Sequence, residues 1–285
     1  MSIERSDAFA YCAEQVKRYD GDRYATVLFA PEASRPALFS LYAFNLEIAK
    51  TREVVTQPMI GQIRLQWWRE TLDGVFDGAP RGHAVALALA GVVRAAGLDR
   101  RLFDRLIDTR EADLEEAAPE TLADLLTYAE GTSSTLTLLA LQALGNDFGG
   151  PTMEAGREIG IAWALTGLLR AIPFHARTRR VMLPAEIMHA ADASPSELFA
   201  LRDSPAIRRA AAELADLARE RLAAARRLRA EVPRAALPAL LPATLADGYL
   251  NLLRRSAYNV FDPRVSAALP FRSWRLLAAS TTGRY

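Results

Sequence analysis

The sequence predicts an all-α fold, and three of its features support this prediction. Apolar residues recur at helical spacing along nearly the whole chain. No segment shows the sustained alternation of apolar and polar residues that a half-buried strand requires. Neither an internal repeat nor a Gly/Ser-rich or charged linker divides the 285 residues. We therefore expect one helical domain over residues 1–285.

In the first half of the chain, local signals define four expected helices. Ser34 followed by Pro36 marks a helix start, and the apolar stripe that follows places Glu53 one turn beyond its last member. The stripe consists of Leu38, Leu41, Tyr42, Ile48 and Ala49. Further helices are expected over residues 60–76, 84–96 and 100–116, with a loop at 78–83. Trp67 and Trp68 are adjacent, so only one of them can face the core squarely.

The second half of the chain is expected to contain longer helices. One covers residues 121–145, is interrupted at Gly131 and ends at glycine. Another covers residues 152–172, where Pro173 removes a backbone donor and kinks or ends the helix. A capping-box pattern begins at Ser194. The remaining helices are expected over residues 206–231 and 243–258, before a tail from residue 261 that is irregular at first and then weakly helical.

Composition excludes several classes of protein. The chain is 51% hydrophobic and 24% charged, and its formal net charge of +1 argues against binding nucleic acid through bulk electrostatics. Cys12 is the only cysteine, so no disulfide or cysteine-based metal site can form within the chain, which fits a reducing compartment.

We find no signal-peptide pattern and no stretch of about 20 apolar residues. Only two of the 35 basic residues are lysines, which is typical of a GC-rich bacterial genome. We expect a cytoplasmic protein, with peripheral contact at the inner membrane as the alternative.

Residues 168–184 read LLRAIPFHARTRRVMLP and carry the most informative pattern in the chain. They resemble the second signature of the squalene/phytoene synthase family, whose two aspartates bind magnesium. Arg170 and Arg180 of that signature are kept. The two aspartate positions are occupied by Ala171 and His175.

Residues 38–54, LFSLYAFNLEIAKTREV, resemble the first signature of the same family. Its two adjacent aspartates fall at Ala49 and Lys50, and the third falls at Glu53, the only carboxylate kept. Magnesium neutralises a leaving pyrophosphate by bridging carboxylates and phosphate oxygens. Two eroded signatures therefore indicate that this ionisation chemistry is lost.

The resemblance covers residues 11–262 and leaves 263–285 as a C-terminal tail. It implies an isoprenoid-synthase-type helical bundle around a central cavity. Within the family, the segments RAIPFH and AFNLEIA look most like the degenerate branch that includes the mitochondrial complex I assembly factor with a phytoene-synthase-like domain.

Two functions follow from this resemblance. The first is a non-catalytic protein that assists the assembly of respiratory complex I, with a protein partner, no cofactor and no metal site. A prenyl or other anionic lipid is a candidate ligand. The alternative is a head-to-head prenyltransferase that joins two prenyl diphosphates to a squalene- or phytoene-type product with Mg²⁺. It requires other acids, such as Glu47, Glu53 and Asp113, to converge on the cavity.

No residue is assigned a catalytic role, but several charged residues are candidates for the site. Arg170 is expected to face the cavity with Ala49, Glu53 and Ala171, either as an anion clamp or in an ion pair with Glu53 or Asp113. Arg177 and Arg180, with Arg179 between them, either bind the diphosphate or form a solvated loop. Arg110 and Asp113 are expected to point inward as a structural ion pair. His175 is a candidate metal ligand or base, although a lone histidine is more often neither.

The remaining candidates are uncharged or lie in the tail. Residues expected to line the cavity are Tyr24, Tyr42, Asn45, Tyr128, Ser133 and Thr166, although core packing also explains the aromatic ones. In the tail, apolar residues alternate with arginines. Phe271, Trp274, Leu276 and Leu277 lie among Arg272, Arg275 and Arg284. This pattern predicts either an interfacial anchor or a tail that packs on the bundle.

Overall fold

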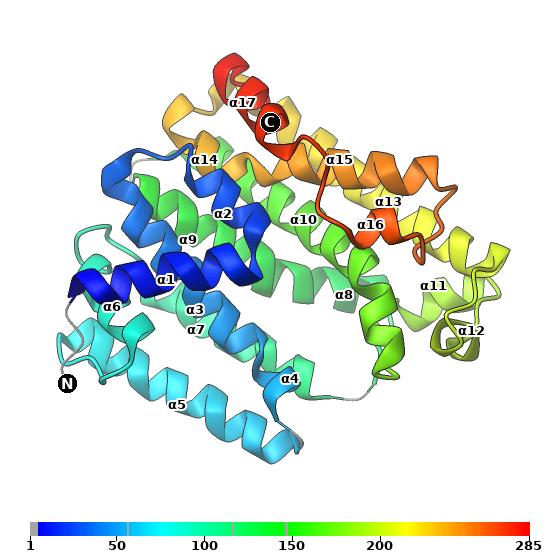
Figure 1. Cartoon of the computed structure of the whole chain (residues 1–285), viewed down its shortest axis with the longest axis horizontal. Coiled ribbons are helices and arrows are strands. Elements are labelled where there is room, and N and C mark those ends of the chain that lie inside the picture. Colours follow the sequence, from blue (N-terminus) through cyan, green and yellow to red (C-terminus); the bar gives the residue numbers. More distant parts are fainter. Residues whose placement is uncertain (1–4, 56, 116, 146–147) are drawn as a thin grey trace.

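The computed structural model describes residues 5–55, 57–115, 117–145 and 148–285, and within these ranges the chain is helical and contains no strand (Figure 1). The all-α prediction is confirmed. The N-terminal helices are α1 Arg5–Tyr19, α2 Gly21–Val27, α3 Arg35–Ala49, α4 Thr51–Val54, α5 Pro58–Asp77, α6 Ala84–Val92 and α7 Arg100–Arg110. Then follow α8 Leu122–Ala129, α9 Thr135–Leu144, α10 Gly150–Arg177, α11 Ala185–Ala190 and α12 Pro195–Phe199. The C-terminal helices are α13 Pro205–Arg227, α14 Leu237–Leu240, α15 Pro242–Arg255, α16 Pro263–Ser266 and α17 Arg272–Thr282.

Helix α10 lies in the middle of the bundle and contacts α13, α9 and α15 (Figure 1). Its buried residues include Ile159, Leu165 and Leu169, which join the main hydrophobic core. By length and composition alone α10 could cross a membrane, contrary to the expectation from the sequence. Its most apolar window has a mean hydropathy of 1.3, but half of that window is buried inside the protein, as in a core helix.

Most expected helices form, with shifted ends. Helix α10 continues through Pro173 to Arg177, so the expected end at residue 172 is wrong. The region expected as one helix over 100–116 is α7 followed by a 3₁₀ turn over Glu111–Leu114, and residue 116 lies outside the described residues. Of the paired tryptophans, Trp68 is buried in the core and Trp67 is half-buried. The capping box at Ser194 is present, because its hydroxyl accepts from the backbone N–H of Glu197.

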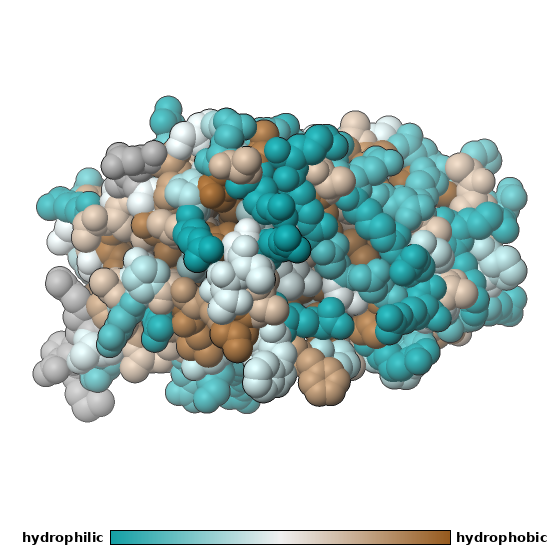
Figure 2. Space-filling view, turned by 90° about the horizontal axis from the view of Figure 1, so that it is seen from above, coloured by the Kyte–Doolittle hydropathy of each residue, from teal (hydrophilic) through white to brown (hydrophobic). Residues whose placement is uncertain are grey.

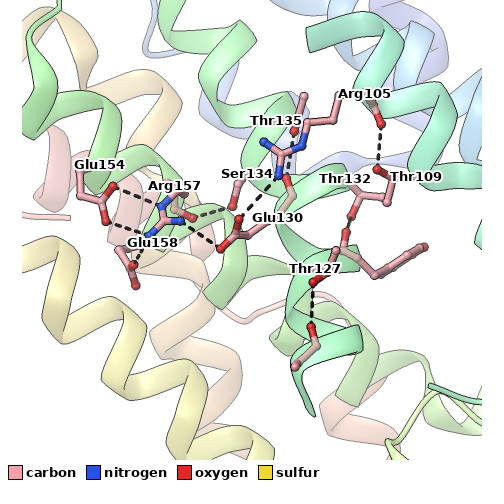
Figure 3. Close-up of polar contacts among 12 residues, drawn as sticks. Arg105, Thr109, Thr127, Glu130, Thr132, Ser134, Thr135, Glu154, Arg157 and Glu158 are labelled. Atoms are coloured by element: carbon pink, nitrogen blue, oxygen red, sulfur yellow. Dashed lines mark hydrogen bonds and ion pairs between the residues drawn. The ribbon is translucent and has the colours of Figure 1, made fainter. Parts of the chain in front are cut away.

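The interruption expected at Gly131 is a π-helical segment, Glu130–Ser134, that joins α8 to α9. Figure 3 shows its polar contacts with α10: Ser134 Oγ donates to the Arg157 carbonyl at 2.6 Å, and Arg157 pairs with Glu130 at 3.1 Å. The two backbones approach closely at Gly160. A methyl group added there would lie 2.3 Å from the Cα atom of Ser134. Glycine at this position therefore sets the spacing between α10 and the π-helical segment.

Cys12, the only cysteine of the chain, is fully buried on α1. Burial raises the pKa of its thiol to about 12, against the opposing effect of a hydrogen bond with Ser40. The thiol is therefore protonated at neutral pH and sealed from solvent.

Two glycines of α10 should respond oppositely to substitution by alanine. Gly160→Ala forces a methyl group against the backbone of Ser134, so we expect it to lower the free energy of unfolding by about 1–3 kcal/mol. Gly167→Ala is the matched control: its added methyl group meets no atom within 4 Å, so we expect a gain of about 0.5–1 kcal/mol from reduced chain entropy. Urea denaturation measures both values. Equal stability of the two variants would contradict the close approach.

Candidate functional site

A cavity of about 870 Å³ opens between the C-terminal end of α3, the 3₁₀ turn after α7, the α8–π segment and the second half of α10. Its walls combine charged and aromatic side chains with small residues. The residues that line it are Arg23, Asn45, Ala49, Arg52, Glu53, Arg110, Asp113, Glu115, Tyr128, Thr132, Ser133, Trp163, Ala164, Gly167, Leu168, Ala171, Phe174, His175, Thr178, Arg179, Arg180 and Met182.

The two signature segments meet at this cavity. Ala49 and Glu53 line it from α3 and α4, and Ala171 and His175 line it from α10. Lys50 does not line it. The Lys50 ammonium lies 3.1 Å from the centroid of the Tyr19 ring, a cation–π contact on α1.

A network of charges around Asp113 forms one wall of the cavity. Asp113 is buried and pairs with Arg110 at 3.1 Å, so the inward-facing Arg110–Asp113 pair is confirmed. The Tyr128 hydroxyl donates to Asp113 at 2.8 Å and accepts from Arg110 at 2.8 Å. Arg180 approaches the same carboxylate at 3.5 Å. Burial, above all, raises the pKa of the Tyr128 hydroxyl, so this group remains a neutral donor.

The residues of the cavity do not fit a magnesium cluster. Asp113 is already committed to two arginines and a tyrosine. Glu47 pairs with Arg64 at 2.6 Å and does not line the cavity, so the three acids that the prenyltransferase alternative requires do not converge there. Within the described ranges, no group of three Asp, Glu, His or Cys side chains is arranged to hold a metal ion.

The expectation that Arg170 faces the cavity is wrong. Its guanidinium lies outside the cavity lining, where it pairs with Asp22 at 3.5 Å and donates to the Val265 carbonyl at 3.2 Å. It also stacks on the Tyr249 ring, with 3.5 Å between the guanidinium carbon and the ring centroid. Arg170 is thus a structural residue, paired neither with Glu53 nor with Asp113.

The same Asp22 carboxylate holds the C-terminal segment. Arg272 of α17 donates to it at 3.1 Å, and the Tyr249 hydroxyl donates to it at 2.6 Å. Because Asp22 is buried, one carboxylate joins α2, α10, α15 and α17.

Half of the uncharged candidates line the cavity. Asn45, Tyr128 and Ser133 do, as expected. The other three lie elsewhere, because their helical positions point into the core. Tyr24 stacks on Phe39, Tyr42 is buried beneath the Arg23 guanidinium, and the Thr166 hydroxyl donates to the Ala162 carbonyl.

Two arginines that line the cavity were not predicted from the sequence. Arg23 comes from α2 and Arg52 from α4. The only indication of Arg52 in the sequence is its position next to Glu53, a predicted site residue. Arg179 and Arg180 line the cavity after α10, whereas Arg177 is exposed and lies outside it.

The cavity lining carries an excess of positive charge. Five arginines line it, against the carboxylates of Glu53, Asp113 and Glu115. Arg52 and Arg179 have no carboxylate partner within the part of the chain that is described. The Ser133 hydroxyl is buried at the cavity and has no hydrogen-bond partner among those residues. This arrangement suits an anion, because unpaired guanidinium and hydroxyl groups donate to phosphate or carboxylate oxygens.

A family model described as squalene/phytoene synthase matches residues 16–271. Complex I assembly factor 6 of Bos taurus is 32% identical over 273 residues, which are 93% of this chain and 81% of the relative. The Homo sapiens protein is 30% identical with the same coverage. The 15-cis-phytoene synthase of Synechococcus elongatus is 29% identical over 68% of this chain and 66% of its own length.

Solved structures share the fold. The squalene synthase HpnC of Alicyclobacillus acidocaldarius superposes with a TM-score of 0.79 at 22% identity, covering 91% of this chain and 97% of that one. A dehydrosqualene synthase gives a TM-score of 0.82 at 19% identity, covering 98% and 97%. The expected isoprenoid-synthase bundle is therefore confirmed.

The burial of His175 leads to a prediction about pH. Burial, with Arg180 nearby, lowers the pKa of His175 from 6.5 to about 4, so the folded protein holds a neutral imidazole. As pH falls from 6.5 to 4, the unfolded chain takes up a proton that the folded protein resists. We expect the free energy of unfolding to fall by roughly 2 kcal/mol over this window. His175→Gln should remove this part of the loss in denaturation series at several pH values. A variant series in which His175→Gln loses as much stability between pH 6.5 and pH 4 as wild type would contradict this prediction.

Proposed function

The chain belongs to the squalene/phytoene synthase family, and we propose that it is a non-catalytic member that acts as an assembly factor in respiratory complex I biogenesis. Relatives named as complex I assembly factor 6 match it over 93% of its length at 30–32% identity, which supports the assembly role. We propose a protein partner on this ground, since an assembly factor acts on other chains.

The make-up of the cavity wall is the observation that carries the proposal. Two small residues, Ala49 and Ala171, and the neutral His175 line the cavity at three of the five positions where the family resemblance places aspartates. A fourth position, Lys50, does not line the cavity, and only the fifth, Glu53, offers a carboxylate to it. Without a carboxylate cluster, a leaving pyrophosphate would lack the divalent cations that make it a good leaving group. We propose accordingly that the protein works without a metal cofactor.

The second candidate is a prenyltransferase, which the size of the cavity and the similarity to 15-cis-phytoene synthases favour. It would need Mg²⁺, for which the acids of the cavity offer no cluster among the described residues. We therefore rank it second.

An activity assay and a genetic test separate the two functions. We expect the pure protein, incubated with farnesyl or geranylgeranyl diphosphate, Mg²⁺ and NADPH, to give no squalene, phytoene or cyclopropyl intermediate by mass spectrometry.

Deletion of the gene in its own host should lower assembled complex I on native gels and leave another respiratory enzyme unchanged. Complementation by Ala171→Asp should restore assembly, because the proposed role does not use the cavity chemistry. Product above a heat-killed control would establish the second candidate instead.

We infer further that the cavity binds an anionic group, such as the head of a prenyl or other anionic lipid. Arg179 lines the cavity, and Arg177, two residues earlier, does not. We expect Arg179→Gln to weaken pyrophosphate binding about tenfold in calorimetric titration, since it removes one charged donor. Arg177→Gln changes the net charge equally and should bind like wild type. Equal weakening by both would attribute the binding to general surface charge and exclude the cavity.

A further inference from the structure

Helix α17 presents an apolar face to solvent that the bundle does not use. Its inner side carries Leu276 and Ala279, which are buried in a small core with Tyr249. Its outer side carries Phe271, Trp274 and Leu277, with exposed fractions of 77%, 71% and 44%. Trp274 and Leu277, three positions apart, lie along one face of the helix, and Phe271 is the residue that precedes its first turn. Figure 2, which looks down on the end of the molecule where α17 lies in Figure 1, shows apolar residues exposed among hydrophilic ones.

The charge of this segment has one sign. Residues 263–285 contain four arginines and no aspartate or glutamate. Arg264 pairs with Asp262, and Arg272 pairs with Asp22. Arg275 and Arg284 are exposed, and no carboxylate pairs with either of them among the described residues. The apolar face is therefore flanked by free positive charge.

The backbone at Phe271 adds an independent observation. Phe271 precedes the first turn of α17 in the left-handed region, with φ of 56°. This conformation is unfavourable for a bulky residue and easy for glycine. Phe271 is thus held in a strained conformation although its side chain contributes little to the core. Phe271 is one of six non-glycine residues in the left-handed region, and it is the most exposed large hydrophobic residue of the described chain.

We propose that α17 docks the protein flat on an anionic lipid surface, with Phe271, Trp274 and Leu277 entering the interface and Arg275 and Arg284 binding lipid phosphates. Tryptophan and phenylalanine favour the boundary between headgroups and acyl chains, and each arginine near such a surface is attracted to anionic lipids. The Arg272–Asp22 pair holds α17 on the bundle, so the face is presented without rearrangement. The proposal is independent of the proposed function, because it uses neither the cavity nor a complex I partner.

Sedimentation with vesicles tests the proposal. We expect wild-type protein to bind vesicles of phosphatidylglycerol and phosphatidylcholine, and to bind pure phosphatidylcholine much more weakly. Phe271→Ala combined with Trp274→Ala should lower the partition coefficient at least about tenfold. Met59→Ala combined with Ile63→Ala removes two residues of α5 that are 68% and 63% exposed, and should bind like wild type. Arg275→Gln should weaken binding to the anionic vesicles about fivefold.

A single substitution separates docking from folding. Phe271→Gly relieves the left-handed strain, so we expect an unchanged or higher Tm together with weaker vesicle binding. Binding by the Phe271/Trp274 variant equal to that of wild type would overturn the proposal. The proposal would also be overturned if wild-type protein formed a dimer without lipid and the Phe271/Trp274 variant were monomeric. The apolar face would then be a contact between two copies of the chain.

Discussion

The buried carboxylate of Asp113 is the constraint on which the cavity depends. A charge in that position must be compensated, and Arg110, Arg180 and Tyr128 do so from three separate segments. The carboxylate thereby joins the turn after α7, helix α8 and the loop that follows α10. Since Asp113 and its partners satisfy one another, the network is a wall of the cavity and leaves little free carboxylate to capture a cation. The remaining free charge of the cavity is positive.

Helix α10 connects this cavity to the cluster of charges around Asp22. Neighbouring residues of a helix project about 100° apart, so Ala171 can line the cavity while Arg170 reaches Asp22. Asp22 in turn holds Arg272 at the start of α17. One turn of α10 is thus shared by the cavity wall and by the anchor of the C-terminal helix. The two are separate features of the molecule, but a change in α10 would affect both.

The same geometry explains which parts of the site could be predicted from the sequence. Helical periodicity and caps located most helices, and the two signatures located the cavity wall at Ala49, Glu53, Ala171 and His175. The prediction for Arg170 is wrong because this residue projects about 100° away from its neighbour Ala171 on the helix. Its partner, Asp22, is 148 residues away in the chain, and no local pattern reveals such a pair. Arg23 was missed because arginine is so frequent in this chain that a single one carries no signal. The continuation of α10 through Pro173 depends on tertiary packing, which outweighs one lost hydrogen bond.

The sealed thiol of Cys12 makes the molecule convenient for spectroscopy. A protonated, fully buried sulfur reacts poorly with maleimides and other thiol reagents, so the native chain offers no competing site for a label. One cysteine introduced on the surface would carry a fluorophore or spin label at a single known position without any background substitution. We can therefore measure the depth of such a probe in a bilayer, or its distance from a second label, without changing the core of the protein.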